Sequence, residues 1–245
     1  MSEGMDHSRV DGARQDGRPD RRAERRLRLH AKTPAVDPAM PIPDDPIYAL
    51  AKRTFDVVFS IAALFVTAPL CLTVAALVRL TSPGPAIFRQ PRVGRGGRPF
   101  TCLKFRTMVE DAHSTKEHLR DLNEMDGPVF KIRKDPRVTR IGAWLRRLSI
   151  DEIPQFVNVL RGDMSIVGPR PPLPEEVERY RPRDRRRLAV TPGLTCLWQV
   201  GGRADIQFDH WVELDLEYIR RRGFWLDVAI VLRTIPAVIS GRGAA

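Results

Sequence analysis

The sequence predicts an α/β protein, mostly helical with a small β-hairpin or sheet, in which a re-entrant membrane helix hairpin precedes a larger folded domain. Three observations predict this fold. Residues 57–78 contain no charged side chain, two strand-like segments flank a glycine-rich turn, and the rest of the chain carries helical patterns. The 245 residues are enough for one domain with a core and a tail.

Residues 1–46 are expected to form a disordered polar tail. They are nearly free of large apolar side chains, so they cannot bury enough surface to offset the entropy of ordering. They hold nine basic and nine acidic residues, so the formal net charge of +11 falls on residues 47–245. A basic folded part favours an anionic partner, which is a nucleic acid, an anionic membrane or a phosphorylated substrate. The three cysteines include no Cys-x-x-Cys pair and indicate neither a disulfide framework nor a zinc site.

Residues 47–82 are predicted to enter a membrane. The 22 uncharged residues from 57 to 78 have the length that a bilayer-spanning helix needs. Pro69 interrupts this stretch and predicts a kink, because it removes a backbone hydrogen bond. Lys52 and Arg53 precede the stretch and Arg79 follows it, and positive charge marks the cytoplasmic side. We therefore expect a hairpin that bends at Pro69 and returns to the same face; a straight span and a buried core helix are the alternatives.

Residues 83–245 are expected to form one cytoplasmic domain. Strand-like segments at 86–93 and 99–108, on either side of the turn at 94–97, predict a β-hairpin. Helices are predicted over residues 109–124, 141–148, 153–160, 208–222 and 226–239. The last two are amphipathic, and their aromatic and arginine residues favour the membrane interface, with packing on the core as the alternative.

An acidic pair is the first candidate for chemistry. Asp151 and Glu152 lie in an apolar setting directly after Arg146 and Arg147. Burial beside cations is how carboxylates acquire perturbed pKa values and become useful in a site. An aspartate can attack phosphorus as a nucleophile, and an adjacent glutamate can act as a general base. These residue types therefore indicate phosphoryl chemistry.

Basic residues near this pair are candidate phosphate ligands. Arginine offers paired N–H groups that fit phosphate oxygens. In residues 168–172, Pro169 and Pro171 hold Arg170 on a rigid loop. Neither a Walker A sequence nor a GxGxxG string after a strand is present, so a P-loop or Rossmann site does not explain these ligands. The candidate ligands are Lys104, Arg106, Arg137, Arg146 and Arg170.

Residues 52–244 resemble the bacterial sugar transferase family, the monotopic polyprenyl-phosphate phosphoglycosyl transferases, in their short exopolysaccharide-type form. The matching strings are KRTFDVVFS, TSPGPAIFRQPRVGRGGRPF, KFRTM, DGPVFKIRKDPRVTRIGAWLRRLSIDEIPQ, NVLRGDMSIVGPRPP and TPGLTCLWQVGGR. The chain departs from the family pattern at three positions. Ala68 precedes the membrane proline where some members have Ser, Cys196 stands where Gly is common, and Gly201 stands where Ser is common.

The resemblance implies transfer of a sugar 1-phosphate from a UDP-sugar to polyprenyl (undecaprenyl) phosphate, with release of UMP, through a covalent aspartyl-phosphosugar intermediate. Asp151 would be the nucleophile and a contact of Mg²⁺, and Glu152 would assist proton removal or positioning. Arg170 would hold the nucleotide, and Lys104 and Arg146 occupy positions where the family binds phosphate. This would be the first membrane step of exopolysaccharide assembly.

The resemblance also implies where the protein works and with what. It places the site at the cytoplasmic face of the bacterial inner membrane, in contact with membrane lipids. Glucose or galactose phosphate is the expected cargo, and a homodimer is an open alternative to a monomer.

Two other interpretations stay open at this point. A nucleic-acid-binding protein would fit the net charge of +11, but the uncharged stretch argues against it and no standard motif occurs, so we expect no nucleic-acid partner. A catalytically inactive membrane scaffold of the same fold is the second alternative. The intact pair Asp151 and Glu152 argues against it.

Overall fold

The computed structural model describes residues 45–110, 112, 114–201 and 207–240. The predicted tail therefore lies almost wholly outside the described residues. Helix α2 (Pro46–Thr81) is the first described element, and its beginning has two sequence causes. The Asp45 carboxylate accepts hydrogen bonds from the backbone N–H groups of Ile47 and Tyr48, at 2.9 and 3.1 Å, and Pro46 occupies the first turn, where its missing N–H costs nothing.

Helix α2 presents a long apolar face to the outside of the protein. Among the described residues it is the one helix long and apolar enough to cross a membrane, and 11% of its most apolar window is buried. A soluble protein rarely leaves so large an apolar surface exposed. This surface indicates association with a membrane. Its exposed apolar side chains include Val58, Ile61, Phe65, Val66, Leu72 and Leu80.

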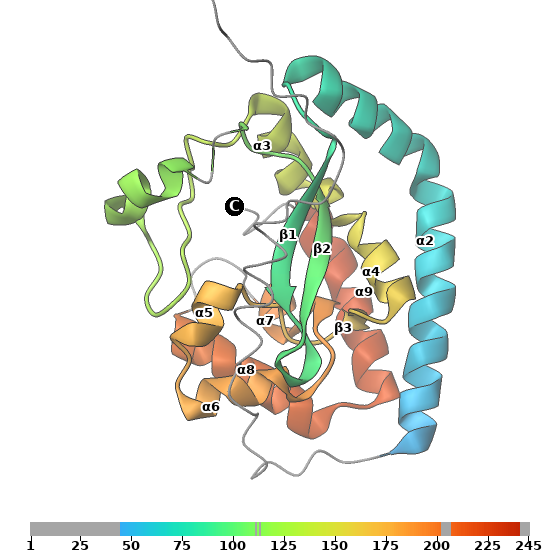
Figure 1. Cartoon of the computed structure of the whole chain (residues 1–245). Helices are drawn as coiled ribbons and strands as arrows, with labels where there is room; N and C mark the ends of the chain where they lie inside the picture. The colour runs from blue at the N-terminus through green and yellow to red at the C-terminus, as the bar shows by residue number, and fades with distance from the viewer. Residues whose placement is uncertain (1–44, 111, 113, 202–206, 241–245) are drawn as a thin grey trace, which may run out of the picture.

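Pro69 lies inside this helix and does not end it. Helix α2 is continuous from Pro46 to Thr81, so the expected hairpin is not present as two separate helices. Figure 1 shows instead that the helix runs along the domain and changes direction in its upper part. The Thr67 and Thr73 hydroxyls donate to the carbonyls of Ala63 and Pro69 within the helix, at 2.6 and 3.0 Å. Such bonds to the preceding turn bend helices, as does an internal proline.

Both ends of α2 contact the same domain. Near its beginning, Lys52 donates to the carbonyl of Val167 at 3.0 Å. Near its end, Val74 and Val78 are buried in a cluster with Phe105, Leu145 and Ile150. The exposed middle therefore lies between two segments that pack on one globular body.

The predicted β-hairpin is confirmed. Strand β1 (Ile87–Val93) pairs antiparallel with β2 (Pro99–Phe105), and the glycine-rich turn between them contains a short 3₁₀ segment, η1 (Arg95–Gly97). Gly96 and Gly97 have positive φ angles, which glycine adopts without the steric cost that a side chain brings. A second sheet was not predicted: β3 (Ser165–Val167) pairs in parallel with β4 (Gly193–Thr195).

The predicted helices are found, with one correction. The polar segment 109–124 is not an α-helix; its helical part is a 3₁₀ helix, η2 (Ser114–Leu122). The expected helix at 153–160 begins at Gln155, because residues 150–152 form a 3₁₀ turn first. The predicted ends at 148 and 222 each lie one residue beyond the observed ones. The remaining helical elements are α3 (Arg140–Arg147), η3 (Ile150–Glu152), α4 (Gln155–Arg161), α5 (Pro174–Glu178), α6 (Pro182–Arg185), η4 (Arg186–Ala189), α7 (Leu197–Gly201), α8 (Phe208–Arg221) and α9 (Phe224–Ser240).

The apolar face of α8 packs on the core. Phe208, Trp211, Val212, Leu216 and Ile219 are all buried in the main hydrophobic cluster. The alternative that the sequence left open, core packing, is therefore the observed one for this helix. Helix α9 differs, since Trp225, Leu232 and Ile235 remain exposed on its outer side.

Candidate functional site

A cavity of about 950 Å³ collects the candidate residues. Its wall is formed by the β-hairpin, η3, the loop after β3 and the segment between β2 and α3, and α9 contributes mostly apolar side chains to it. Its size matches ordinary small-molecule sites, which reach about 1,000 Å³. Of the residues predicted from the sequence, it brings together Lys104, Arg106, Arg137, Arg146, Asp151, Glu152 and Arg170.

A strained turn presents the acidic pair to this cavity. Helix α3 ends at Arg147, and Ser149 then adopts a left-handed conformation with φ of 55°. A non-glycine residue with positive φ is uncommon and costs about 1 kcal/mol or more, and such strain concentrates at functional sites. The Ser149 carbonyl accepts from the Glu152 N–H at 3.2 Å and closes the turn η3. This turn places Asp151 and Glu152 at the cavity wall.

The two carboxyls have opposite pKa shifts. Asp151 is 7% exposed, and burial raises its pKa above the usual aspartate range, although the charge of Lys104 works against the rise. Burial acts in the same direction on Glu152, but Lys104, together with Arg170 and Arg92, outweighs it, and the pKa of this carboxyl is lowered. The Lys104 ammonium lies 2.6 Å from Glu152 Oε1. Glu152 is therefore held as an anion by a paired cation, while Asp151 is a buried carboxyl without such a direct partner in the part of the chain described.

Arg146 lies on the last turn of α3 and lines the same cavity. Its Nε donates to Thr107 Oγ1 at 2.9 Å, and burial lowers its pKa while the charge of Asp151 opposes the shift. The helix approaches this closely because residue 142 is glycine. A Cβ at Gly142 would clash with the Thr107 carbonyl. The close approach of α3 thus brings Arg146 to the cavity near Asp151.

Arg170 lies on the proline loop that follows β3. Its guanidinium is 3.6 Å from the carboxylate of Glu176 and stacks 5.9 Å from the ring centroid of Trp211. The carbonyl of Pro169 accepts from the N–H of Gly193 at 2.9 Å, and the carbonyl of Pro171 accepts from the guanidinium of Arg92 at 2.8 Å. Both prolines therefore act through their backbone, and they fix the loop that carries Arg170.

Two predicted ligands have guanidinium groups engaged elsewhere. Arg106 donates to the carbonyl of Ser82 at 2.8 Å and also to that of Pro83, at the end of α2. Arg137 forms an ion pair of 2.6 Å with Asp135 and lies over the ring of Phe130. Both side chains line the cavity. Through the carbonyl of Ser82, the residue that caps α2, Arg106 supports the end of this helix, where carbonyls lack partners within the helix.

Arg92 and two tryptophans were missed by the sequence interpretation. Arg92 is buried on β1 and lines the cavity. Trp198 and Trp211 stack with ring centroids 4.2 Å apart and line the cavity as well. A signal for Arg92 was present, since it alternates with Gln90 and Phe88 on one face of a predicted strand.

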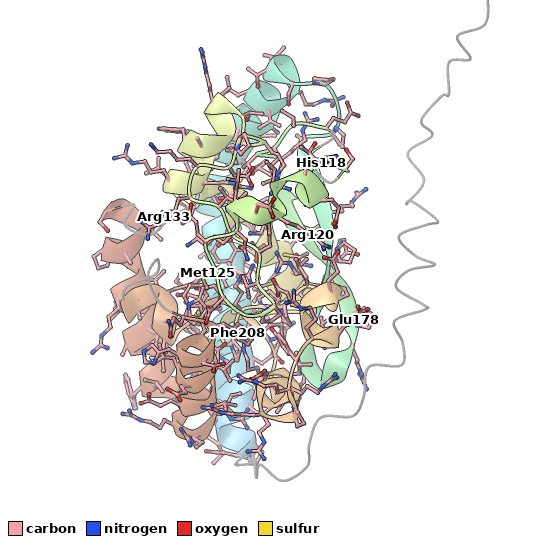
Figure 2. All side chains as sticks on the ribbon, turned by 90° about the vertical axis from the view of Figure 1, so that its left-hand side faces the viewer. His118, Arg120, Met125, Arg133, Glu178 and Phe208 are labelled. Atoms are coloured by element: carbon pink, nitrogen blue, oxygen red, sulfur yellow. The ribbon has the colours of Figure 1, made fainter. Side chains whose placement is uncertain are left out.

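The segment between β2 and α3 forms the outer wall. Figure 2 views the protein from this side, with His118, Arg120, Met125 and Arg133 along the segment in front of the hairpin. The Asp126 carboxylate accepts from the N–H of Phe208 at 2.8 Å and ties the segment to α8. A side chain at residue 127 would press on the Phe208 ring, and Gly127 also has a positive φ of 68°.

The residues of the cavity fit a divalent cation held mainly by a substrate. Among the described residues, no three His, Cys, Asp or Glu side chains gather as a metal-binding cluster. Mg²⁺ commonly binds through one or two carboxylates together with substrate phosphates and water. Because the Glu152 carboxylate is paired with Lys104, Asp151 is the carboxylate suited to bind the cation.

Comparison with known proteins decides the family. The bacterial sugar transferase family matches residues 47–241 of this chain. The chain belongs to the bacterial sugar transferase family. It is 42% identical over 203 residues to the exopolysaccharide production protein ExoY of Rhizobium meliloti, which covers 81% of this chain and 90% of that protein.

Longer relatives match as well. The galactosyl transferase CpsE of Streptococcus agalactiae is 46% identical over 198 residues, covering 80% of this chain and 44% of that protein. The undecaprenyl-phosphate galactose phosphotransferase of Salmonella typhimurium is 42% identical over 201 residues, covering 79% and 41%. The chain thus spans less than half the length of these two relatives and most of the length of ExoY.

Proposed function

We propose that this sugar transferase moves a sugar 1-phosphate from a UDP-sugar to a polyprenyl phosphate and releases UMP. The observation that carries the proposal is the buried Asp151 beside the ion pair of Glu152 and Lys104 in a cavity rich in cations. Relatives named as undecaprenyl-phosphate galactose and glucose phosphotransferases support the acceptor, and a relative named as a UDP-galactose-lipid carrier transferase supports the class of donor. Galactose or glucose phosphate is accordingly the proposed cargo.

The proposed reaction has two transfers at phosphorus. An Asp151 carboxylate oxygen attacks the phosphorus attached to the sugar, the bond from that phosphorus to the bridging diphosphate oxygen breaks, and UMP leaves with the electron pair. A phosphate oxygen of the lipid acceptor then attacks the same phosphorus. The phosphorus–carboxylate bond breaks, the diphosphate-linked lipid forms, and Asp151 is free again. Such covalent catalysis divides one difficult step into two easier ones.

The surrounding residues would stabilise charge during these transfers. Lys104 keeps Glu152 ionised, and its charge opposes the rise that burial causes in the pKa of Asp151, which favours the carboxylate form of the nucleophile. Arg146 and Arg170 lie where they can bind phosphate oxygens, and prearranged cations of this kind lower the barrier of phosphoryl transfer. A bound Mg²⁺ would neutralise diphosphate charge at Asp151.

We further propose that α2 enters the membrane and returns to the cytoplasmic face. Its two ends pack on one domain, through Lys52 on one side and through Val74 and Val78 on the other. A straight span would place these ends on opposite sides of a bilayer about 30 Å thick. Re-entry at the bend near Pro69 is compatible with both contacts, and it puts the cavity at the level of the lipid headgroups.

UMP release tests the reaction. Detergent-solubilised full chain would be supplied with undecaprenyl phosphate, Mg²⁺ and a panel of UDP-sugars, with Asp151→Asn and, as a matched control at an exposed acid, Asp121→Asn. Release with one sugar, lost in Asp151→Asn and kept in the control, is the expected result. No UMP release with any UDP-sugar of the panel would contradict the transferase proposal and favour an inactive scaffold. Salt-dependent retention on DNA without such release would favour the nucleic-acid alternative.

Cysteine labelling tests the membrane path. A cysteine placed near each end of α2, at the exposed positions 47 and 80, should react with a membrane-impermeant reagent only after the cells are opened and the reagent reaches the cytoplasmic face. Labelling of one position from outside intact cells would show a straight span. Changing Pro69 to Leu should shift some molecules toward that arrangement, because the proline favours the bend.

A further inference from the structure

One face of the β-hairpin supplies two cations to the cavity. Side chains alternate between the faces of a strand, and Phe88, Gln90 and Arg92 of β1 all line the cavity. In the pairing of the hairpin, Phe88 lies opposite Lys104 of β2, which is on the same face. Arg92 therefore stands on the same surface as the lysine that pairs with Glu152.

The guanidinium of Arg92 is oriented from two sides. Gln90 Oε1 accepts from its Nε at 3.1 Å and from its Nη2 at 2.7 Å. Its Nη1 donates to the carbonyl of Pro171 at 2.8 Å. A guanidinium has five N–H groups, so these three bonds leave two for a ligand. The group is therefore held in one orientation and still has donors for an anion.

Arg92 and Arg170 are neighbouring cations on one wall. Burial lowers the pKa of Arg92, and the positive charge of Arg170 lowers it further, while Glu176 opposes the shift. The Glu176 carboxylate is shared, because it lies 3.6 Å from Arg170 and also accepts from the N–H of Leu173 at 2.9 Å. Both arginines line the cavity, and neighbouring guanidiniums bind phosphate oxygens through charge-assisted hydrogen bonds.

We propose that Arg92 is a second arginine of the nucleotide site: it binds the phosphate of UMP together with Arg170 and holds the Arg170 loop through the carbonyl of Pro171. The inference rests on the proposed function, because it assumes a uridine nucleotide as donor and leaving group. Val93 adds a second backbone link, since its N–H donates to the carbonyl of Pro172 at 2.9 Å. These two hydrogen bonds hold the loop that carries Arg170 against the strand that carries Arg92.

Binding of UMP and of uridine separates this role from a merely structural one. Arg92→Gln removes the charge and keeps a polar side chain, and a hydrogen bond to a charged group is strong enough that its loss should raise the Kd for UMP about tenfold or more. The Kd for uridine, which has no phosphate, should change less than about twofold by the same reasoning. Arg92→Lys keeps the charge without the planar fork and should lie between wild type and Arg92→Gln. Arg89→Gln, an exposed position on the same strand, is the matched control and should bind UMP as wild type does.

Calorimetry on the detergent-solubilised full chain gives both constants, and a melting curve of each variant reports its folding. Equal weakening of UMP and uridine in Arg92→Gln would overturn the inference, and so would a Kd for UMP that stays unchanged in both Arg92 variants. If Arg92→Gln does not fold, the UMP-to-uridine ratio of Arg92→Lys decides in the same way. If the wild type transfers sugar phosphate and Arg92→Gln binds UMP as the wild type does, the inference is refuted and the proposed function stays intact. A wild type that neither binds UMP nor releases it would remove both.

Discussion

Replacement of Lys104 by Met tests how one cation controls both carboxyls. The Lys104 ammonium lies 2.6 Å from Glu152 Oε1, and its charge lowers the pKa of Asp151 and of Glu152 against the effect of burial. Methionine keeps an unbranched side chain of similar length and removes the charge. Without the cation, the pKa values of both carboxyls should rise.

The magnitude follows from the exposure of the pair. A hydrogen bond to a charged group contributes about 1.5–3 kcal/mol. The side chains of Lys104 and Glu152 are 23% and 32% exposed, so solvent screens part of this interaction and the lower figure applies. About 1.4 kcal/mol corresponds to a factor of ten, so kcat/KM should fall roughly tenfold.

The pH dependence gives a second readout with a definite sign. Only the ionised form of Asp151 attacks phosphorus, so the acid side of the rate profile follows the ionisation of this carboxyl. Loss of Lys104 raises the pKa of Asp151, and activity should then be lost at a higher pH than in the wild type. UMP exchange into the UDP-sugar without lipid acceptor isolates this first transfer. Lys134→Met, at an exposed lysine, is the control. An unchanged rate and an unchanged acid limb in Lys104→Met would refute the assigned role of the pair.

Three further substitutions have expected outcomes that denaturant titration in detergent can check. Gly142→Ala should destabilise the fold by about 1–3 kcal/mol and lower activity, because the new Cβ clashes with a backbone carbonyl. Its control is Gly201→Ala, whose Cβ would meet no atom within 4 Å from other parts of the described chain, and it should stay within about 0.5 kcal/mol of wild type. Lys52→Met should lower the free energy of unfolding by about 3 kcal/mol, since it leaves the buried Asp227 without the cation that lies 2.7 Å away. Equal stability would show that the two tyrosine hydroxyls that donate to this carboxylate are enough to stabilise it. Ser149→Gly should stabilise the fold by about 1 kcal/mol by relieving the positive φ; a loss of stability would mean that the serine side chain, not the backbone, decides there.

Sequence patterns over short stretches predicted the elements that such stretches can form, namely the β-hairpin and the amphipathic helices. The β-hairpin followed from strand alternation around a glycine-rich turn, and both strands are found within a few residues of their predicted bounds. The helix at 208–222 followed from its apolar face, and α8 ends at Arg221. The sequence did not predict what this apolar face packs against, because an amphipathic face fits a membrane surface and a protein core equally well. Burial of Trp211 and Ile219 in the core is a tertiary result.

Long-range contacts explain what the sequence left unpredicted. Strands β3 and β4 have three residues each, too few for a recognisable period, and they pair across the chain. They can approach because residues 168 and 193 are both glycine, and a Cβ at either would clash with the backbone of the other segment. For the same reason the sequence could nominate Arg106 as a basic residue but not show that its guanidinium binds carbonyls at the end of α2.

Arg106 links the end of the apolar helix to the acidic pair. Residues 104 and 106 are two apart along an extended segment, so their side chains leave the same face. Arg106 holds the end of α2 through the carbonyl of Ser82, and its own N–H donates to the carbonyl of Ala86 at 2.8 Å. Lys104, one strand step away, holds Glu152. The segment that fixes the end of the apolar helix therefore also fixes the cation that keeps Glu152 ionised.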